Sequence, residues 1–375
     1  MDQRRYYDRL DSTAEDPGEL FEHFERRSTN GRTYHALPDA RHGVERGTVI
    51  VDDADAVVRG YPSIPRVLVL ETGIPSFFDR EASVAVEEKL DGFNVRIADV
   101  GDPLAFTRGG YVCPYTTDRA RDLLDLEAFF ADHPEKMLSA ELIGPETPYT
   151  SHDYDAIDSH AIRMFDVRDR ESGTPLPVDD RRSLLEDYGF PQPHFFGRYN
   201  PGDAVEEVRS AIDELDSADR EGVVMKSADG ERMVKYTTES QHHDELAFAF
   251  SLPFDHGQDF VFSRIVREAF QAAELDEDRD RLRERARDLG ESILLPMVES
   301  IETVADGDSI GEHQTVRGDP ETVDALLSHL RDQSLTIEVE ADRRENGIRV
   351  IEFTKVAESS RDRIQYYLEG GTRDE

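Results

Sequence analysis

The sequence predicts an α+β fold, because strand patterns and helix patterns occupy different parts of the chain. Between about residues 61 and 238, short apolar runs recur between polar turns, which is typical of strands. After about residue 239, apolar residues recur at spacings of three and four, which is typical of amphipathic helices. Strands followed by a run of helices indicate that the two kinds of element are segregated in the fold.

The first 238 residues predict mostly strands, with two helices among them. Two of the strands flank the turn that carries Lys89. In the second helix the apolar side chains follow helical spacing. The strands are predicted at residues 47–52, 84–87, 94–97, 137–143, 161–167, 222–226 and 232–236, and the helices at 19–27 and 120–132.

The remaining residues predict three helices and then a small α/β unit. Asn346-Gly347 predicts a turn between the last two strands. Residues 241–244 include two histidines, which we interpret as a solvated helix start, because adjacent residues on a helix do not face each other. The helices are predicted at 244–252, 260–273, 276–304 and 323–330, and the strands at 335–339 and 348–353.

The helix at 276–304 carries its apolar side chains on one face. Pro296 is expected to kink it. On pattern alone, this face is interpreted as intramolecular core rather than as a subunit interface. The face comprises Leu282, Ala286, Leu289, Ile293, Met297 and Ile301.

Acidic residues outnumber basic residues by 82 to 44, so the net charge is -38 at pH 7. In dilute buffer such a charge would repel nucleic acid. At about 1 M salt, however, the Debye length is about 3 Å, and only local basic clusters would matter. We interpret the acidity as adaptation to a salty cytoplasm. Disorder is the alternative, but apolar periodic segments recur along the whole chain.

The single cysteine, Cys113, excludes an internal disulfide and a multi-cysteine zinc site. No apolar run approaches the roughly 18 residues that a membrane span requires. The N-terminus also lacks an apolar signal core. These features predict a soluble protein of the cytoplasm, without a membrane partner.

Lysine is scarce in this chain, which contains five, and three of them lie in two short motifs. Lys89 lies in the first, and Lys226 and Lys235 lie in the second. Arginine can replace lysine as a surface charge but not as a nucleophile, because it stays protonated. The retained lysines therefore indicate amine chemistry.

A lysine nucleophile must be neutral, although its reference pKa is about 10.4. We expect burial and nearby cations, namely Lys226, Lys235 and a metal ion, to lower the pKa of Lys89. Glycine at position 92 would let the backbone turn tightly beside a ligand. The carboxylate of Glu221 suits a divalent cation, which would offset the charge of a triphosphate.

Six motifs in order resemble those of the covalent nucleotidyltransferases, the superfamily of polynucleotide ligases and mRNA capping enzymes. Each motif alone is weak, but their order across about 150 residues makes the resemblance specific. The motifs are Lys89-Leu90-Asp91-Gly92-Phe93-Asn94 (motif I), Thr107-Arg108-Gly109-Gly110 (an arginine-glycine element), Glu141-Leu142-Ile143-Gly144 (motif III), Phe165-Asp166-Val167 (motif IIIa), Glu221 to Lys226 (motif IV) and Val234-Lys235-Tyr236 (motif V).

Asn94 and the segment Arg59-Gly60-Tyr61-Pro62 narrow the resemblance to the archaeal homodimeric ATP-dependent RNA ligases. DNA ligases and capping enzymes usually carry arginine at the position of Asn94. This resemblance implies a homodimer and favours a subunit interface for the apolar face of the helix at 276–304. Together with the acidity, it predicts a salt-adapted, haloarchaeon-like source. The implied units are an N-terminal β elaboration (1–60), a nucleotidyltransferase core of ATP-grasp-like antiparallel sheets with helices (61–238), a helical dimerisation domain (239–308) and a small C-terminal α/β domain (309–375).

The resemblance implies a role for each matched residue. Lys89 would form a phosphoramidate with AMP. Asn94 would lie in the nucleotide site. Motif V often reads lysine-x-lysine, but Met233 takes the first position here, so the division of work between the other lysines stays open. The remaining implied contacts are Glu87 (or Glu88) to the adenine amino group, Phe165 to the adenine face, Arg108 and Glu141 to the ribose, Glu221 to the metal, and Lys226 and Lys235 to the α-phosphate.

The implied reaction uses ATP with Mg²⁺ or Mn²⁺ and joins an RNA 5′-phosphate to a 3′-hydroxyl. Lys89 would take AMP from ATP, AMP would pass to the 5′-phosphate, and the 3′-hydroxyl would then displace it. The alternatives are a DNA ligase or a capping guanylyltransferase, which normally continue into an OB-fold barrel; the helical pattern after residue 240 argues against both. A non-catalytic nucleotide- or RNA-binding module would not need the intact Lys89, Glu221 and Lys235.

Overall fold

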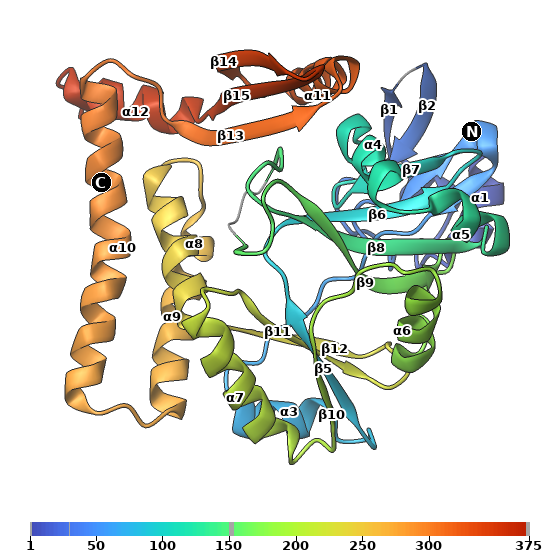
Figure 1. Cartoon of the computed structure of the whole chain (residues 1–375), viewed down its shortest axis with the longest axis horizontal. Coiled ribbons are helices and arrows are strands. Elements are labelled where there is room, and N and C mark those ends of the chain that lie inside the picture. The colour runs from blue at the N-terminus through green and yellow to red at the C-terminus, as the bar shows by residue number, and fades with distance from the viewer. Residues whose placement is uncertain (1, 30, 150–153, 373–375) are drawn as a thin grey trace.

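The computed structural model describes residues 2–29, 31–149 and 154–372. Its strands form four antiparallel sheets, and helices pack around them (Figure 1), so the predicted α+β class is confirmed. Two central sheets lie between an N-terminal sheet and a layer of three long helices, and a C-terminal sheet spans from that layer back to the central sheets.

The N-terminal sheet contains four strands in the order β1-β2-β3-β4. The helix predicted at 19–27 is wrong in its second half, because residues 25–27 lie in β1 and pair with β2. These residues are polar and show no apolar periodicity, so only the pairing reveals the strand. The elements are α1 (Gln3–Leu10), α2 (Pro17–Phe21), β1 (Glu25–Thr29), β2 (Arg32–Ala36), β3 (Val49–Val51), a 3₁₀ turn (Asp52–Ala54) and β4 (Ala56–Val58).

The first central sheet has the order β10-β5-β11-β12. Helices α3 and α7 bury their apolar residues against one of its faces. Burial of such side chains contributes about 25 cal/mol per Å² of apolar surface and holds the sheet rigid. The elements are β5 (Val84–Lys89), β10 (Phe195–Tyr199), β11 (Gly222–Ser227), β12 (Met233–Thr237), α3 (Leu70–Phe77) and α7 (Ala204–Ser217).

The second central sheet has the order β7-β6-β8-β9 and is covered on both faces. The N-terminal sheet packs on one face, and helices pack on the other. The single helix predicted at 120–132 is two helices, because Asp125 caps a new helix by accepting a hydrogen bond from the Ala128 amide at 3.1 Å. The elements are β6 (Phe93–Asp99), β7 (Pro103–Thr107), β8 (Lys136–Ile143), β9 (Ala161–Asp169), α4 (Pro114–Leu123), α5 (Leu126–Asp132) and α6 (Val178–Asp187).

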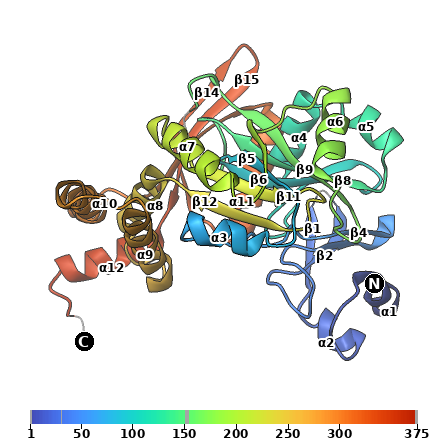
Figure 2. The same ribbon diagram turned by 90° about the horizontal axis from the view of Figure 1, so that it is seen from below.

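The helical layer comprises α8 (Glu239–Ser251), α9 (Gln258–Glu274) and α10 (Arg279–Ala305), close to the three predicted helices. Helix α10 lies on the outer side of this layer (Figure 2). Pro296 lies inside α10 without ending it. The interpretation of its apolar face as intramolecular core is wrong for much of that face. Of that face, Leu282, Ala286 and Ile301 are exposed, and Leu289, Ile293 and Met297 are only partly buried. Helix α10 also exposes Leu294, Leu295 and Val298, which lie outside the predicted face.

The C-terminal sheet has the order β13-β15-β14, and the turn predicted at Asn346-Gly347 is confirmed by positive φ angles of 53° and 91°. Its core extends to Tyr115 of α4, so the sheet is anchored to the second central sheet. The sequence patterns missed β13 and α12. The elements are β13 (Gly311–Gly318), α11 (Pro320–Asp332), β14 (Ile337–Glu345), β15 (Ile348–Val356) and α12 (Glu358–Leu368). Among the described residues, none of the helices is long and apolar enough to cross a membrane.

A buried ionic network joins the three long helices. Arg285 of α10 is 4% exposed and contacts carboxylates of α8, of α9 and of the segment that leads into α10. Its guanidinium lies 2.7 Å from Glu239 on α8, 2.7 Å from Glu268 on α9 and 2.6 Å from Glu277, just before α10. Because the carboxylates outnumber the arginine, removal of Arg285 would leave buried negative charges facing one another.

We therefore expect Arg285→Ala to lower the free energy of unfolding by about 3–5 kcal/mol. Chemical denaturation in molar salt, followed by circular dichroism, measures this loss. Arg283→Ala is the matched control on the same helix, because Arg283 is exposed and pairs only with Asp280 on the surface; it should stay within about 0.5 kcal/mol of wild type. Equal losses in the two variants would contradict the structural role of the network.

Candidate active site

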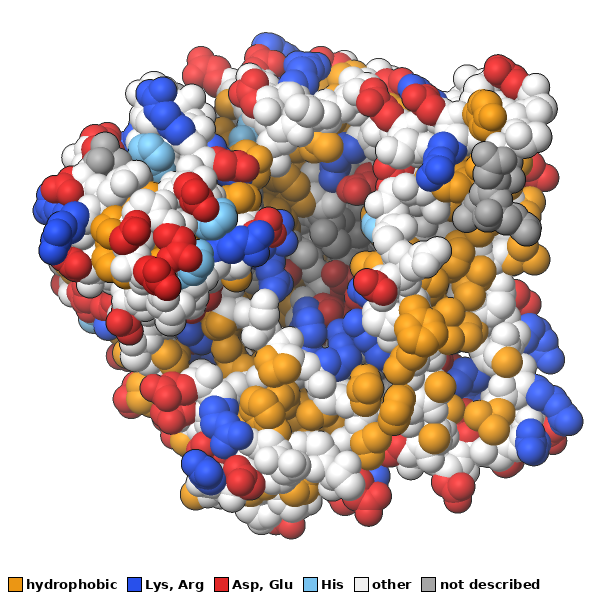
Figure 3. Space-filling view, turned by 180° about the vertical axis from the view of Figure 1, so that it is seen from behind, with side chains coloured by type: hydrophobic (Ala, Val, Ile, Leu, Met, Phe, Trp, Pro, Cys, Tyr) orange, Lys and Arg blue, Asp and Glu red, His pale blue; other side chains and the backbone are white. Residues whose placement is uncertain are grey.

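One pocket, lined by residues of both central sheets, contains most of the predicted site. It is lined by eight of the nine predicted residues, and the ninth, Glu221, contacts Lys89 directly. The cavity has a volume of about 110 Å³. Figure 3 shows a hollow in one face of the molecule, with Lys and Arg side chains gathered along its lower edge. The eight lining residues are Glu87, Lys89, Asn94, Arg108, Glu141, Phe165, Lys226 and Lys235.

Lys89 is the last residue of β5 and lies where the chain crosses from one central sheet to the other. The crossing is tight, since a Cβ on Gly92 would lie 2.5 Å from the carbonyl oxygen of Leu142. The hydroxyl of Tyr154 also braces the turn, lying 2.9 Å from the amide nitrogen and 3.0 Å from the carbonyl oxygen of Asp91. The turn therefore holds Lys89 in one place, as the glycine at position 92 predicted.

The ammonium of Lys89 is paired with a carboxylate in this structure. Its Nζ lies 2.5 Å from Oε2 of Glu221, a residue of the neighbouring chain segment that leads into β11. Burial lowers the pKa of Lys89, but attraction to Glu221 and Glu141 outweighs burial and leaves that pKa above its usual value. The expected lowering of the Lys89 pKa is therefore wrong, because the carboxylates of Glu221 and Glu141 outweigh the effect of burial.

Two carboxylates beside Lys89 are themselves perturbed. Burial raises the pKa of Glu141 to about 8, and Glu221 adds to the shift by repulsion. Burial likewise raises the pKa of Glu221. Asn94 faces Glu141 across β6 and β8, and its side chain hydrogen-bonds to that carboxyl group. A site of buried carboxyl oxygens with raised pKa values fits a hard divalent cation, which would favour their ionised forms.

Unlike Lys89, the two other lysines of the pocket, Lys226 and Lys235, have lowered pKa values. Burial, followed by repulsion from Lys89 and Arg66, lowers the pKa of Lys235 to about 8. Arg66 lies beside it because residue 66 forms a bridge with the backbone of Lys235 on β12. Lys235 and Lys89 therefore share one electrostatic environment, as their predicted placement at one phosphate requires.

Lys226 is more buried than Lys235 and pairs with a different carboxylate from that of Lys89. Its Nζ is 3.0 Å from Oε2 of Glu87 and donates to the carbonyl oxygen of Phe165 at 2.7 Å. Burial would raise the pKa of Glu87, but Lys226 and Arg181 outweigh burial and lower this pKa to about 2. The structure thus separates Lys226, which accompanies Glu87, from Lys235, which accompanies Lys89.

Arg181 of α6 is a site residue that sequence reasoning missed. It is 1% exposed, and its guanidinium donates to both oxygens of Glu87 and to the carbonyl oxygen of Phe165. Arg182 adds a single contact to Glu87 at 3.1 Å. No local signal distinguishes either arginine, because the helix is polar and the partner is more than 90 positions away in the sequence.

The walls above this ion pair are apolar and aromatic. The ring of Phe165 meets the edge of Tyr61 at 5.3 Å and 85°. Such walls suit a planar base, while Arg108 is exposed at the rim. The pocket is also lined by the apolar residues Pro62, Ile64, Pro193 and Val224.

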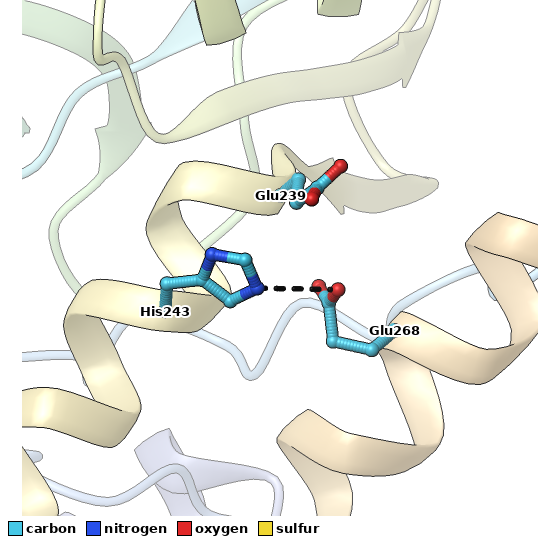
Figure 4. A group of neighbouring side chains, drawn as sticks. All are labelled: Glu239, His243 and Glu268. Carbon is cyan, nitrogen blue, oxygen red and sulfur yellow. Dashed lines mark ion pairs between the residues drawn. The ribbon is translucent and has the colours of Figure 1, made fainter. Parts of the chain in front are cut away.

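The histidines at 242 and 243 are not solvated, so that expectation is wrong. Helix α8 starts directly after β12, and His242 Nε2 lies 2.7 Å from Thr237 Oγ1. In the part of the chain that the structure describes, Glu239, His243 and Glu268 are the group whose ligand atoms lie close enough to hold a metal ion (Figure 4). The guanidinium of Arg285 already contacts both carboxylates, so a cation there would meet a fixed positive charge. We assign this group to the ionic network.

Comparison with known proteins decides the family. A family model described as RNA ligase matches residues 82–237, and one described as the C-terminal region of the ligase Pab1020 matches residues 248–371. Two solved structures of an archaeal ATP-dependent RNA ligase match the whole length of both chains at 40% identity, with TM-scores of 0.91 and 0.92. This chain belongs to the archaeal ATP-dependent RNA ligase family.

Two further relatives of the ligase are informative. An uncharacterized protein of Methanocaldococcus jannaschii is 37% identical over 340 residues, which cover 88% of this chain and 85% of that protein. A solved structure named as a candidate ATP-dependent DNA ligase from Aquifex aeolicus is 26% identical, covers 96% of this chain and all of that chain, and has a TM-score of 0.87. The helical part after residue 240 therefore does not by itself separate RNA ligases from DNA ligases.

Arg181 gives a test of the deep end of the ligase pocket. We expect Arg181→Met to reduce covalent labelling by ATP about 10-fold or more, because a buried Glu87 would lose its two-point partner. Labelling rates measured over a range of ATP concentrations give the effect. Arg182→Met is the matched control, because Arg182 is more exposed and makes one longer contact, and its loss should be several-fold smaller. Equal losses would contradict the assigned role of Arg181.

Proposed function

We propose that the ligase joins RNA ends through a lysine-bound AMP formed on Lys89. In the first step, Nζ of Lys89 attacks the α-phosphorus of ATP, and pyrophosphate leaves. In the second step, an RNA 5′-phosphate oxygen attacks the same phosphorus and frees Lys89. In the third step, an RNA 3′-hydroxyl attacks the 5′-phosphorus, forms the phosphodiester and releases AMP. The observation that supports this proposal most is the pairing of Lys89 with Glu221 inside the pocket that the predicted residues line.

Glu221 is proposed to prepare the nucleophile. Lys89 must lose a proton before it attacks, and Oε2 of Glu221, at 2.5 Å, is placed to accept it. The raised pKa of Glu221 makes this transfer easier than it would be to an exposed carboxylate. Glu221 would also hold Mg²⁺ or Mn²⁺, which when bound would supply positive charge to the triphosphate.

The two remaining lysines are proposed to divide their work. Lys235 lies in the electrostatic environment of Lys89 and would contact the α-phosphate. Lys226 was predicted to share that task, but its pairing with Glu87 supports a place nearer the adenine. Phe165 would stack on the base, Glu87 would face its amino group, and Arg108, Glu141 and Asn94 would surround the ribose.

The decisive experiment is labelling with ATP. Incubation with α-labelled ATP and Mg²⁺ or Mn²⁺ in molar salt should leave AMP on the protein in an acid-labile, alkali-stable bond. Lys89→Ala should abolish the label, whereas Lys136→Ala, which changes a lysine outside the pocket, should label like wild type. A fully labelled Lys89→Ala protein would disprove the nucleophile. Labelling by GTP instead would favour capping chemistry, and competition between RNA and DNA 5′-phosphate ends tests the substrate class.

We also propose that the ligase is a homodimer that uses its helical layer as the interface. Large hydrophobic side chains are exposed on α9 and α10, and Figure 3 shows hydrophobic surface over this layer. Contiguous apolar surface of this kind marks interaction sites in soluble proteins. The exposed residues that support the proposal are Phe262, Phe270, Leu275, Leu282, Leu294, Leu295, Val298 and Ile301.

Charge on this surface should therefore separate the subunits. We expect the double variant Leu294→Asp, Leu295→Asp to sediment as a monomer in molar salt, because buried unpaired carboxylates oppose association. Leu123→Asp is the matched control, because Leu123 is also exposed but lies on α4. A dimeric double variant, or a monomeric wild type, would contradict the interface.

We propose that the chain is divided into four units. They are an N-terminal domain (1–60), a catalytic domain (61–238), a dimerisation domain (239–308) and a C-terminal α/β domain (309–375). The net charge of -38 supports the proposal that the protein works in a cytoplasm of molar salt. Screening at that salt concentration would leave the basic residues along the lower edge of the hollow free to bind RNA.

A further inference from the structure

The loop that carries Arg108 contacts side chains from three parts of the chain: the N-terminal sheet, β6 and α11. This loop, residues 107–111, contains two adjacent glycines and turns back on itself, since Thr107 and Tyr111 pair at 2.8 Å between amide and carbonyl. Gly110 has a φ of +78°, a conformation that L side chains rarely adopt. Such a loop has high conformational freedom when unsupported, so the contacts around it decide where Arg108 points.

Arg27 of the N-terminal sheet contacts the loop on both sides of Gly110. Its Nη1 donates to the carbonyl oxygen of Gly109 at 2.8 Å, and its guanidinium lies 3.6 Å from the ring centre of Tyr111. A guanidinium can donate in its plane and stack on a ring at the same time, which an ammonium cannot do. The Arg27 side chain is only 10% exposed, and its Nη2 also pairs with Glu25 of the same strand at 2.9 Å.

A second arginine, Arg96, contacts the loop from the second central sheet. Arg96 of β6 is fully buried, and its Nη2 donates to the carbonyl oxygens of Thr107 at 3.0 Å and of Gly47 at 2.7 Å. Gly47, also in the N-terminal part, packs so closely that a Cβ there would lie 2.2 Å from the carbonyl oxygen of Arg108. Arg96 thus ties the loop and the N-terminal part together through backbone atoms.

A residue of α11, the helix that packs on the C-terminal sheet, also contacts the loop. His329 of α11 lies edge-on to the ring of Tyr111, with ring centres 5.9 Å apart. Tyr111 therefore lies between Arg27 of the N-terminal sheet and His329 of α11, and residues 27, 111 and 329 meet around one loop. This arrangement links two parts of the chain that carry no residue of the pocket to one residue at its rim.

We infer that the N-terminal sheet positions Arg108 for catalysis, with Arg27 as the positioning residue. The inference rests on the proposed function, in which Arg108 contacts the nucleotide. Loss of the Arg27 hydrogen bond lets the loop shift, and a displacement near 1 Å at a reacting group can cost about 100-fold in rate. An alternative role for the sheet is RNA binding through its own cations, but Arg27 donates to the protein instead of to solvent.

The test uses the full-length ligase and separates two steps. Labelled ATP measures formation of lysine-bound AMP, and RNA that is already adenylated at its 5′ end measures sealing. Arg27→Met, which keeps the aliphatic stem, should slow the same step as Arg108→Ala by about 10- to 100-fold. Combining the two changes should cost no more than Arg108→Ala alone, because Arg27 acts through Arg108. Arg27→Lys should recover part of the rate, since it keeps one donor.

Arg26→Met is the matched control, because Arg26 is exposed on the same strand, and it should behave like wild type in both steps. Amide exchange gives a readout that does not depend on activity. Exchange at Gly109 and Gly110 should be at least 10-fold faster in Arg27→Met than in Arg26→Met. Wild-type rates in Arg27→Met, unchanged exchange at the loop, or losses that multiply in the double variant would overturn the inference. A wild-type protein that forms no AMP adduct would instead contradict the proposed function.

Discussion

Charge pairing inside a buried pocket is the constraint on which the active site depends. Two lysines of the pocket lie beside carboxylates, Lys89 with Glu221 and Lys226 with Glu87. A lone buried charge would cost several kcal/mol, so these pairs set the positions of the side chains before ATP arrives. They also set the protonation states, because the pKa of Glu87 is lowered to about 2 while that of Glu141 is raised to about 8. A bound triphosphate would replace the carboxylates as the partner of the lysines, and a bound metal cation would replace the lysines as the partner of the carboxylates.

The same principle organises the parts around the pocket. Arg285 ties the three long helices through carboxylates, and Arg96 ties the N-terminal part to the Arg108 loop through backbone carbonyls. In a chain with a net charge of -38, these structural contacts are made by arginine, whereas three of the five lysines line the pocket. This division is physically reasonable, because the fork of arginine satisfies several acceptors at once, whereas only lysine can become a neutral nucleophile.

Exposed apolar surface and buried ionic surface coexist in the helical layer. Its inner side carries the Arg285 network, while α10 exposes Leu294 and Leu295 outward. A pattern with helical spacing indicates which residues share a face but not what covers that face. The interpretation as intramolecular core failed for this reason, since coverage depends on where the neighbouring helices lie. The prediction for the histidines at 242 and 243 failed for the same reason, because α8 starts beside β12 of the first central sheet.

The sequence by itself determined the α+β class, most strands of the central sheets and the list of pocket residues, including Lys89, Glu141 and Lys235. These follow from local patterns: alternation, turn residues and short motifs in order are properties of adjacent positions. Only the tertiary structure decided that Arg181 secures Glu87, that Lys226 and Lys235 lie in different environments, and that carboxylates raise the pKa of Lys89. Those features depend on contacts between residues that are far apart in the chain, and electrostatic effects follow distance in space rather than distance in sequence.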